Sequence, residues 1–241
     1  MKLFADTANL KEIADCLERG AIQGITTNPS LLAKEPNADL FEFYGEIVKL
    51  CKAQPEPIPL SVEAVTADAS EMIEQAREVK ERLAYEHLNF KVPLGNRGNA
   101  KSAWNELKAI HSISRFMDVN ATCLYTPQQA VMAANAGARY VSLFFARSED
   151  LGLDATGAVS ATRELLDGRA GGRPVEIIAG SIRTPKQALD AWLAGADIVT
   201  TSVAVMQSMT YHLKSQESVD DFLKDYENWA PGQGPGRPKA G

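Results

Sequence analysis

Short apolar segments alternate along the chain with longer segments whose apolar residues recur at helical spacing. The short segments predict strands at Lys2–Ala5, Ile22–Ile25, Ile58–Val65, Leu88–Val92, Phe116–Ala121, Tyr140–Phe145, Val175–Ala179 and Ile198–Thr201. The longer segments predict helices at Leu10–Arg19, Leu40–Lys52, Ala69–Leu83, Ala100–Ser112, Pro127–Ala136, Ala155–Leu166, Pro185–Ala194 and Val203–Leu213. Each predicted strand is therefore followed by a predicted helix.

Such strict alternation indicates parallel strands joined by helical crossovers. Eight strand–helix units in a chain of 241 residues are typical of an α/β fold of the (β/α)8 type, the TIM barrel. An open doubly wound sheet is the alternative, but it would more typically carry a glycine-rich loop after its first strand. The segment Asp6–Asn9 occupies that place and contains no glycine.

A further helical segment and a Pro/Gly-rich tail follow the eight units. We expect a catalytic barrel domain over residues 1–218, a C-terminal helix over residues 219–230 and a disordered tail over residues 231–241. Four large apolar side chains share one face of the helix predicted at Val219–Trp229, namely Phe222, Leu223, Tyr226 and Trp229. Because such a face needs a partner, either its own barrel or another subunit, we expect a homo-oligomer.

Composition narrows the classes of function. The net charge of −6 argues against nucleic acid as a general partner. No apolar run is long enough to cross a bilayer, and the first residues lack the apolar core of a signal peptide. The 3 cysteines and 3 histidines lack metal-site spacing, and so sparse a cysteine content suits a reducing compartment. We therefore expect a cytoplasmic protein.

One lysine lies inside an apolar strand, at position 91 of the segment Leu88–Pro93. A lysine in a buried strand loses hydration, which favours the neutral amine. A neutral amine is a nucleophile that forms Schiff bases with carbonyl compounds. The alternative is a lysine near the strand end whose ammonium group reaches water.

Polar residues gather at the carboxyl ends of the predicted strands, where active sites lie in this type of barrel. Besides Lys91 they are Asp6, Asn28, Glu63, Asn120, Thr122, Ser142, Arg147, Ser181 and Arg183. Asp6 could instead cap the first helix, Asn28 could organise an Asn-Pro turn, and both arginines could be plain surface charges. Glu63 is harder to dismiss, because a buried carboxylate without a partner is costly. Two arginines at one mouth would suit a phosphate.

Several segments resemble the transaldolase family, including its small-barrel branch with fructose-6-phosphate aldolase. They are Leu3–Thr7, Gly24–Ser30, Phe90–Pro93, Asn120–Thr122 and Ala179–Pro185. The combination of Thr-Thr-Asn-Pro-Ser at Thr26–Ser30 with the lysine strand is highly specific, and the resemblance extends to about residue 229.

The resemblance implies a role for each matched position. Lys91 would form the Schiff base, Asp6 would be the acid and base of C–C bond cleavage and formation, and Glu63 with Thr122 would hold a catalytic water. The other positions would contact the substrate: its sugar part at Asn28, Asn120, Ser142 and Phe144, and its phosphate at Arg147, Ser181 and Arg183.

The resemblance also implies an activity, the transfer of a dihydroxyacetone unit between phosphosugars in the pentose phosphate pathway, without a metal or organic cofactor. Fructose 6-phosphate or sedoheptulose 7-phosphate would be the donor, and erythrose 4-phosphate or glyceraldehyde 3-phosphate the acceptor. Glu63 and Phe144 match the transaldolases, whereas the aldolases, which release free dihydroxyacetone, have Gln and Tyr there. Such an aldolase and a non-catalytic phosphosugar-binding barrel are the two alternatives.

Overall fold

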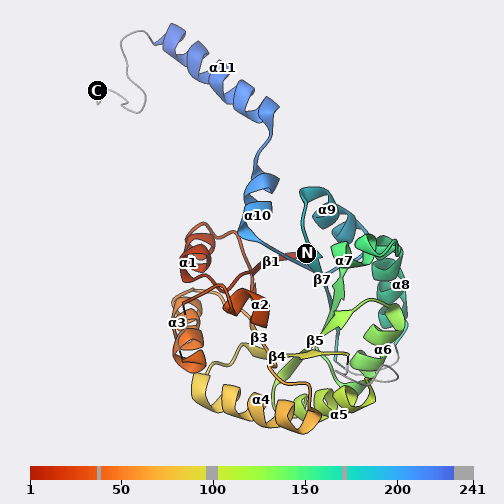
Figure 1. Cartoon of the computed structure of the whole chain (residues 1–241). Coiled ribbons are helices and arrows are strands. Elements are labelled where there is room, and N and C mark those ends of the chain that lie inside the picture. Colours follow the sequence, from red (N-terminus) through yellow and green to blue (C-terminus); the bar gives the residue numbers. More distant parts are fainter. Residues whose placement is uncertain (37–38, 96–102, 170–172, 231–241) are drawn as a thin grey trace.

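The structure is a computed structural model that describes residues 1–36, 39–95, 103–169 and 173–230. Its parallel strands pair in chain order and close into a barrel, with β1 next to β8 (Figure 1). Their bounds are β1 Lys2–Asp6, β2 Ile25–Thr26, β3 Leu60–Glu63, β4 Leu88–Pro93, β5 Asp118–Leu124, β6 Tyr140–Phe144, β7 Glu176–Ile182 and β8 Ile198–Thr201. The predicted (β/α)8 barrel is confirmed, and the open sheet is excluded.

Helices surround the barrel (Figure 1). The longer ones around it are α1 Leu10–Glu18, α3 Leu40–Lys52, α4 Ala69–Leu83, α5 Trp104–Ile113, α6 Pro127–Ala136, α8 Ala155–Asp167 and α9 Pro185–Leu193. Two short helices that the pattern does not predict, α2 (Pro29–Leu32) and α7 (Phe145–Asp150), directly follow β2 and β6. Each is too short to display helical periodicity in the sequence.

The apolar core has two parts, because successive side chains of a strand point to opposite faces. Side chains on the outer face pack against the helices in one large cluster, while Phe4, Tyr140, Ile178 and Ile198 form a separate small cluster. The alternation places this small cluster inside the barrel. Gly24 lies beside it, where a Cβ atom would stand only 2.4 Å from the Phe4 ring. This close approach requires glycine at that position.

Two early strands are shorter than predicted. β3 begins at Leu60 rather than Ile58, because Pro59 has no N–H to donate to a strand ladder. β2 covers only Ile25–Thr26. The residue after it, Thr27, still donates its backbone N–H to the Ser61 carbonyl at 3.2 Å. The segment therefore stays attached to the barrel wall beyond the end of the regular strand.

Two later strands, β5 and β7, run further than predicted and contain irregularities near their carboxyl ends. Cys123 and Ser181 have left-handed backbone angles, with φ of 61° and 59°. The pairing register shifts at both places, between Ala121 and Leu124 and between Ala179 and Ile182. Bulges of this kind redirect side chains, and both lie at the barrel mouth.

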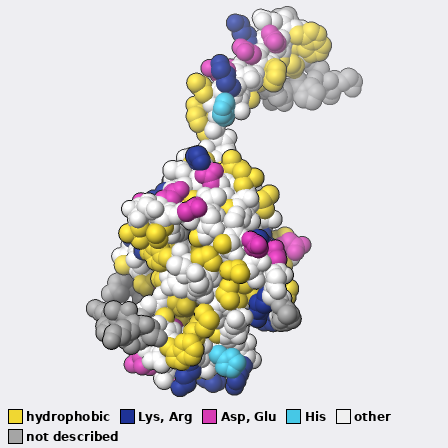
Figure 2. Space-filling model, turned by 90° about the vertical axis from the view of Figure 1, so that its right-hand side faces the viewer, with side chains coloured by type: hydrophobic (Ala, Val, Ile, Leu, Met, Phe, Trp, Pro, Cys, Tyr) yellow, Lys and Arg dark blue, Asp and Glu magenta, His cyan; other side chains and the backbone are white. Residues whose placement is uncertain are grey.

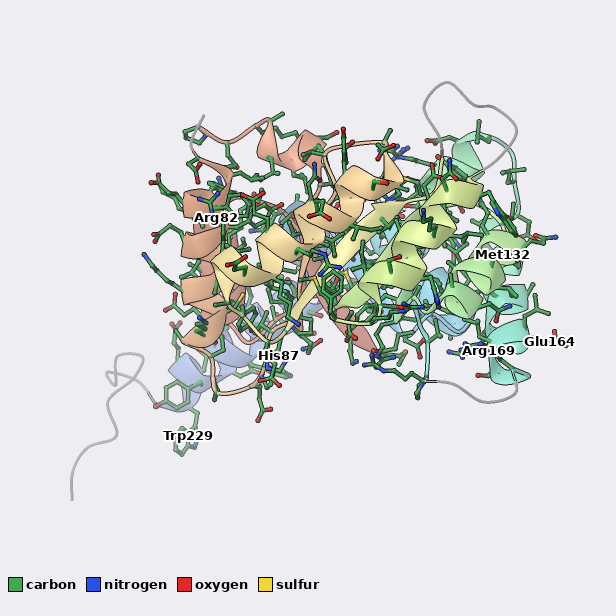
Figure 3. All side chains as sticks on the ribbon, turned by 90° about the horizontal axis from the view of Figure 1, so that it is seen from below. Arg82, His87, Met132, Glu164, Arg169 and Trp229 are labelled. Atoms are coloured by element: carbon green, nitrogen blue, oxygen red, sulfur yellow. The ribbon has the colours of Figure 1, made fainter. Side chains whose placement is uncertain are left out.

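The C-terminal segment leaves the barrel. α10 (Val203–Thr210) is shorter than predicted, and α11 (Leu213–Trp229) begins earlier than the predicted Val219. α11 stands away from the barrel body (Figures 1 and 2) and contains no buried residue. Trp229 is 79% exposed and lies outside the outline of the barrel (Figure 3). The predicted tail at 231–241 lies outside the described residues, and the division into domains stays a prediction.

None of the helices in the described part of the chain is long and apolar enough to cross a membrane.

Candidate active site

A cavity of about 330 Å³ opens at the carboxyl ends of the strands. Nine of the predicted site residues line it: Asp6, Asn28, Glu63, Lys91, Thr122, Ser142, Phe144, Arg147 and Ser181. Among the described residues, Asn120 and Arg183 do not line it. Residues from most of the barrel strands therefore meet in one space, as expected for the mouth of this fold.

The lysine is buried at the mouth and paired with a carboxylate. Lys91 is only 6% exposed, and its Nζ lies 2.7 Å from Glu63 Oε2. The two residues stand opposite each other in the β3–β4 register. Nζ also donates to the Thr27 carbonyl at 2.9 Å. The nitrogen is therefore held by protein groups at the cavity wall, and Glu63 has the partner that a buried carboxylate needs.

Asp6 is held by a chain of two hydroxyl groups. Thr26 Oγ1 donates to Asp6 Oδ1 at 2.8 Å and lies 2.5 Å from Thr200 Oγ1. A hydroxyl has one proton, so Thr200 must donate to Thr26. Asp6 does not cap the first helix, because the side chain of Asn9 caps α1. The chain orients one carboxylate oxygen, while Asp6 itself faces the cavity.

Asn28 organises the Asn-Pro turn and also lines the cavity, while its predicted contact with a substrate stays a prediction. Its Oδ1 accepts the Leu31 backbone N–H at 3.0 Å, which caps α2 at the Asn-Pro turn. The side chain also lines the cavity. Because the cap uses the amide oxygen, the amide N–H₂ group can donate to a ligand oxygen.

A buried polar network lies below the cavity. Ser142 Oγ donates to Asn120 Oδ1 at 2.7 Å, and Asn120 Nδ2 donates to Ser61 Oγ at 3.4 Å. Ser61 in turn donates to Asn89 Oδ1. Asn120 is fully buried, so its amide is occupied by protein partners. Its predicted contact with a substrate stays untested.

The two arginines occupy different settings. Arg147 lies in α7 rather than at the end of a strand, and its guanidinium stands 4.8 Å from the centre of the Phe144 ring. Ser181 also lines the cavity. Arg183 makes a two-point contact with Asp150 on α7, at 2.8 and 3.0 Å. Arg183 is thus at the mouth but points to a protein carboxylate.

Sequence reasoning missed several residues of the cavity wall, among them Thr26, Thr200 and Cys123. The signal for Thr26 was its place within the Thr-Thr-Asn-Pro-Ser motif, whereas a threonine in β8 gave none. Burial raises the pKa of the Cys123 thiol, which keeps it in the less reactive neutral form. Within residues 1–36, 39–95, 103–169 and 173–230, no group of three His, Cys, Asp or Glu side chains could hold a metal ion.

The geometry defines a class of protein: a (β/α)8 barrel with a buried, carboxylate-paired lysine facing a polar cavity. The sequence model described as Transaldolase/Fructose-6-phosphate aldolase matches residues 3–231. The chain belongs to this family.

Individual relatives agree with this assignment. The chain is 36% identical over 228 residues to a probable transaldolase of Symbiobacterium thermophilum, covering 94% of this chain and 97% of the relative. It is 37% identical over 228 residues to a probable transaldolase of Syntrophobacter fumaroxidans, with the same coverage of both chains.

Two solved structures share the fold at 14% identity. A putative dihydrodipicolinate synthetase from Pseudomonas aeruginosa has a TM-score of 0.61, over 87% of this chain and 72% of that chain. A thiamine phosphate pyrophosphorylase from Pyrococcus furiosus has a TM-score of 0.57, over 85% of this chain and 87% of that chain. At this identity the likeness concerns the fold alone.

Proposed function

We propose that this protein is a transaldolase that transfers a dihydroxyacetone unit between phosphosugars through a Schiff base on Lys91. The observation that carries the proposal is the buried Lys91 nitrogen, 2.7 Å from Glu63, in one cavity with Asp6. A barrel that only binds phosphosugars needs neither a buried amine nor a second carboxylate beside it. The donors would be fructose 6-phosphate or sedoheptulose 7-phosphate, and the acceptors erythrose 4-phosphate or glyceraldehyde 3-phosphate.

The proposed reaction begins when Lys91 passes an ammonium proton to Glu63, 2.7 Å away, and the resulting amine attacks the ketone carbon of the donor. Glu63 returns this proton through a water molecule to the former ketone oxygen, which leaves as water and gives an iminium ion. Asp6 takes the proton of the hydroxyl next to the bond that breaks, and the electron pair of that bond moves into the iminium. The first aldose leaves, and the remaining enamine attacks the acceptor aldehyde. Asp6 returns its proton to the new alkoxide, and water releases the new ketose from Lys91.

Transfer rather than hydrolysis is proposed on the basis of Glu63 and Phe144. Both line the cavity, and both match the transaldolases in the resemblance. Phe144 has no hydroxyl to activate a water molecule, so the intermediate would persist until an acceptor arrives. An aldolase that releases dihydroxyacetone is the competing function, and the product assay separates the two.

The test has two readouts. Borohydride with fructose 6-phosphate should trap a covalent adduct that peptide mass spectrometry locates on Lys91. An adduct on another lysine, or none from active enzyme, would overturn the mechanism. In the product assay, turnover of fructose 6-phosphate should depend on erythrose 4-phosphate. Rapid release of dihydroxyacetone without an acceptor would replace the transferase by the aldolase.

We also propose that the protein works in the cytoplasm as a homo-oligomer. The cysteines of the described residues are free thiols, which suits a reducing compartment. α11 leaves Phe222, Tyr226 and Trp229 exposed, and an apolar face of this kind is usually covered by a partner. Truncation after Ser218 should reduce the number of subunits per particle measured by light scattering. An unchanged number of subunits would contradict this role of the helix.

A further inference from the structure

A buried tyrosine outside the barrel wall is connected to the lysine through one residue. Tyr44 lies on α3, is 1% exposed, and has its hydroxyl 2.7 Å from Thr27 Oγ1. Thr27 Oγ1 donates its single proton to the Ser61 carbonyl at 2.8 Å. The Tyr44 hydroxyl must therefore be the donor in its bond with Thr27.

These bonds fix Thr27 just past the end of β2. Its hydroxyl is held by Tyr44 and Ser61, and its backbone N–H is held by the same Ser61 carbonyl at 3.2 Å. Thr27 itself is fully buried. The one backbone group that faces the site is its carbonyl, which accepts from Lys91 Nζ at 2.9 Å.

The arrangement around the lysine nitrogen has a consequence for attack. In the neutral form that attacks a carbonyl, the tetrahedral lysine nitrogen has four directions: one goes to its own carbon, one N–H to the Thr27 carbonyl, and one N–H to Glu63 at 2.7 Å. The fourth direction is left for the lone pair. The position of the Thr27 carbonyl thus sets where the lone pair points.

We propose that Tyr44 is a positioning residue for Lys91, acting through Thr27 to direct the lysine nitrogen at the substrate carbonyl. The inference rests on the proposed Schiff-base function. Neither Tyr44 nor Thr27 lines the cavity, so the effect is on the geometry of attack and not on substrate contact. A misplacement of a reacting group by about 1 Å can slow a reaction by on the order of a hundredfold.

The Tyr44 hydroxyl can donate its hydrogen bond at every ordinary assay pH. Burial raises the pKa of Tyr44 to about 12, and the nearby Glu63 charge adds to the increase. Tyr44 therefore remains protonated below that pH, and its effect on the rate should persist across the neutral range.

Tyr44→Phe tests the inference, with Tyr85→Phe as the matched control. Tyr85 also uses its hydroxyl within the protein, donating to the Ile58 carbonyl at 2.9 Å, and burial raises its pKa to about 12 as well. Tyr44→Phe should slow the formation of the borohydride-trapped adduct and kcat by roughly ten- to hundredfold, with KM changed little. Tyr85→Phe should keep a rate near that of the wild type.

The outcomes separate this inference from the proposed function. If the wild type forms no adduct on Lys91, the proposed function fails. If the wild type forms the adduct and both tyrosine variants match its rate, only the role of Tyr44 is wrong. Thr27→Val should slow the reaction, and Tyr44→Phe should add nothing in that background. Should Tyr44→Phe fail to fold, Thr27→Ser must retain more of the rate than Thr27→Val, or the inference is overturned.

Discussion

The charged side chains on the two sides of the barrel mouth are paired in different ways. On the lysine side, the Lys91 and Glu63 side chains are 8% and 13% exposed and contact each other directly. On the arginine side, Arg183 pairs with Asp150, and both side chains are more than half exposed. Arg147 rests on the Phe144 ring, and within the described part of the chain it has no carboxylate within 4.0 Å.

This difference indicates that the lysine side of the site is more preorganised than the arginine side. Charges in a buried setting interact strongly, while exposed ion pairs are screened by water and salt. The side proposed for the covalent step therefore has its protein contacts in place before any substrate binds. The side proposed for phosphate must exchange at least one protein partner, because Arg183 cannot serve Asp150 and a phosphate equally well.

The largest loss of activity should come from replacing Lys91. Lys91→Arg should abolish turnover, since a guanidinium stays protonated and cannot attack a carbonyl. The measurement is transfer from fructose 6-phosphate to erythrose 4-phosphate. Lys80→Arg is the control, because Lys80 does not line the cavity and donates to the Phe116 carbonyl. Appreciable transfer by Lys91→Arg would contradict the Schiff-base role.

The next largest effect is expected at Phe144, which lines the cavity and contacts Arg147. Phe144→Tyr should raise the release of free dihydroxyacetone and lower transfer, because the new hydroxyl can activate water at the Schiff base. A placed acid–base group is worth about a hundredfold or more. Phe41→Tyr is a matched control: Phe41 also carries an arginine, with the Arg82 guanidinium 3.7 Å from the ring centre, but outside the cavity. An unchanged ratio of free dihydroxyacetone to transfer product in Phe144→Tyr would refute the proposed role of Phe144 in suppressing hydrolysis.

A smaller effect is expected for the arginines. Arg147→Ala or Arg183→Ala should weaken phosphosugar binding by about 1.5–3 kcal/mol, the range for hydrogen bonds to charged groups. We expect the larger loss at Arg147, which already lines the cavity. Activity with unphosphorylated fructose should change far less. Equal losses with both substrates would rule out a phosphate-specific role.

Much of the fold and site follows from the sequence, because strand alternation and strand ends are local patterns. Lys91 and Glu63 could be picked out as polar residues in apolar strands. Their direct pairing could not, since it depends on the β3–β4 register, which no local pattern determines. Thr200 was missed because a threonine is an ordinary strand residue until its neighbour Thr26 is known to hold Asp6.

The arginine side was the least predictable for a related reason. Arg147 and Arg183 were both expected at strand ends, yet Arg147 belongs to a short helix that leaves no periodic signal. The partner of Arg183 is Asp150, which is 33 positions away in sequence. Such an exposed pair depends on how the end of α7 packs beside the end of β7, and no local sequence pattern predicts that packing.

The smallest expected effect is also the sharpest test of the comparison. Asp150→Ala should release Arg183 and tighten phosphosugar binding by up to about fivefold, because an exposed ion pair is worth at most about 1 kcal/mol. Asp190→Ala breaks a comparable pair with Lys186 on α9 and should leave binding unchanged. The effect of Asp150→Ala should disappear when Arg183 is also replaced. Weaker binding in Asp150→Ala would mean that Asp150 holds Arg183 in place for the phosphate, and the arginine side would then be as preorganised as the lysine side.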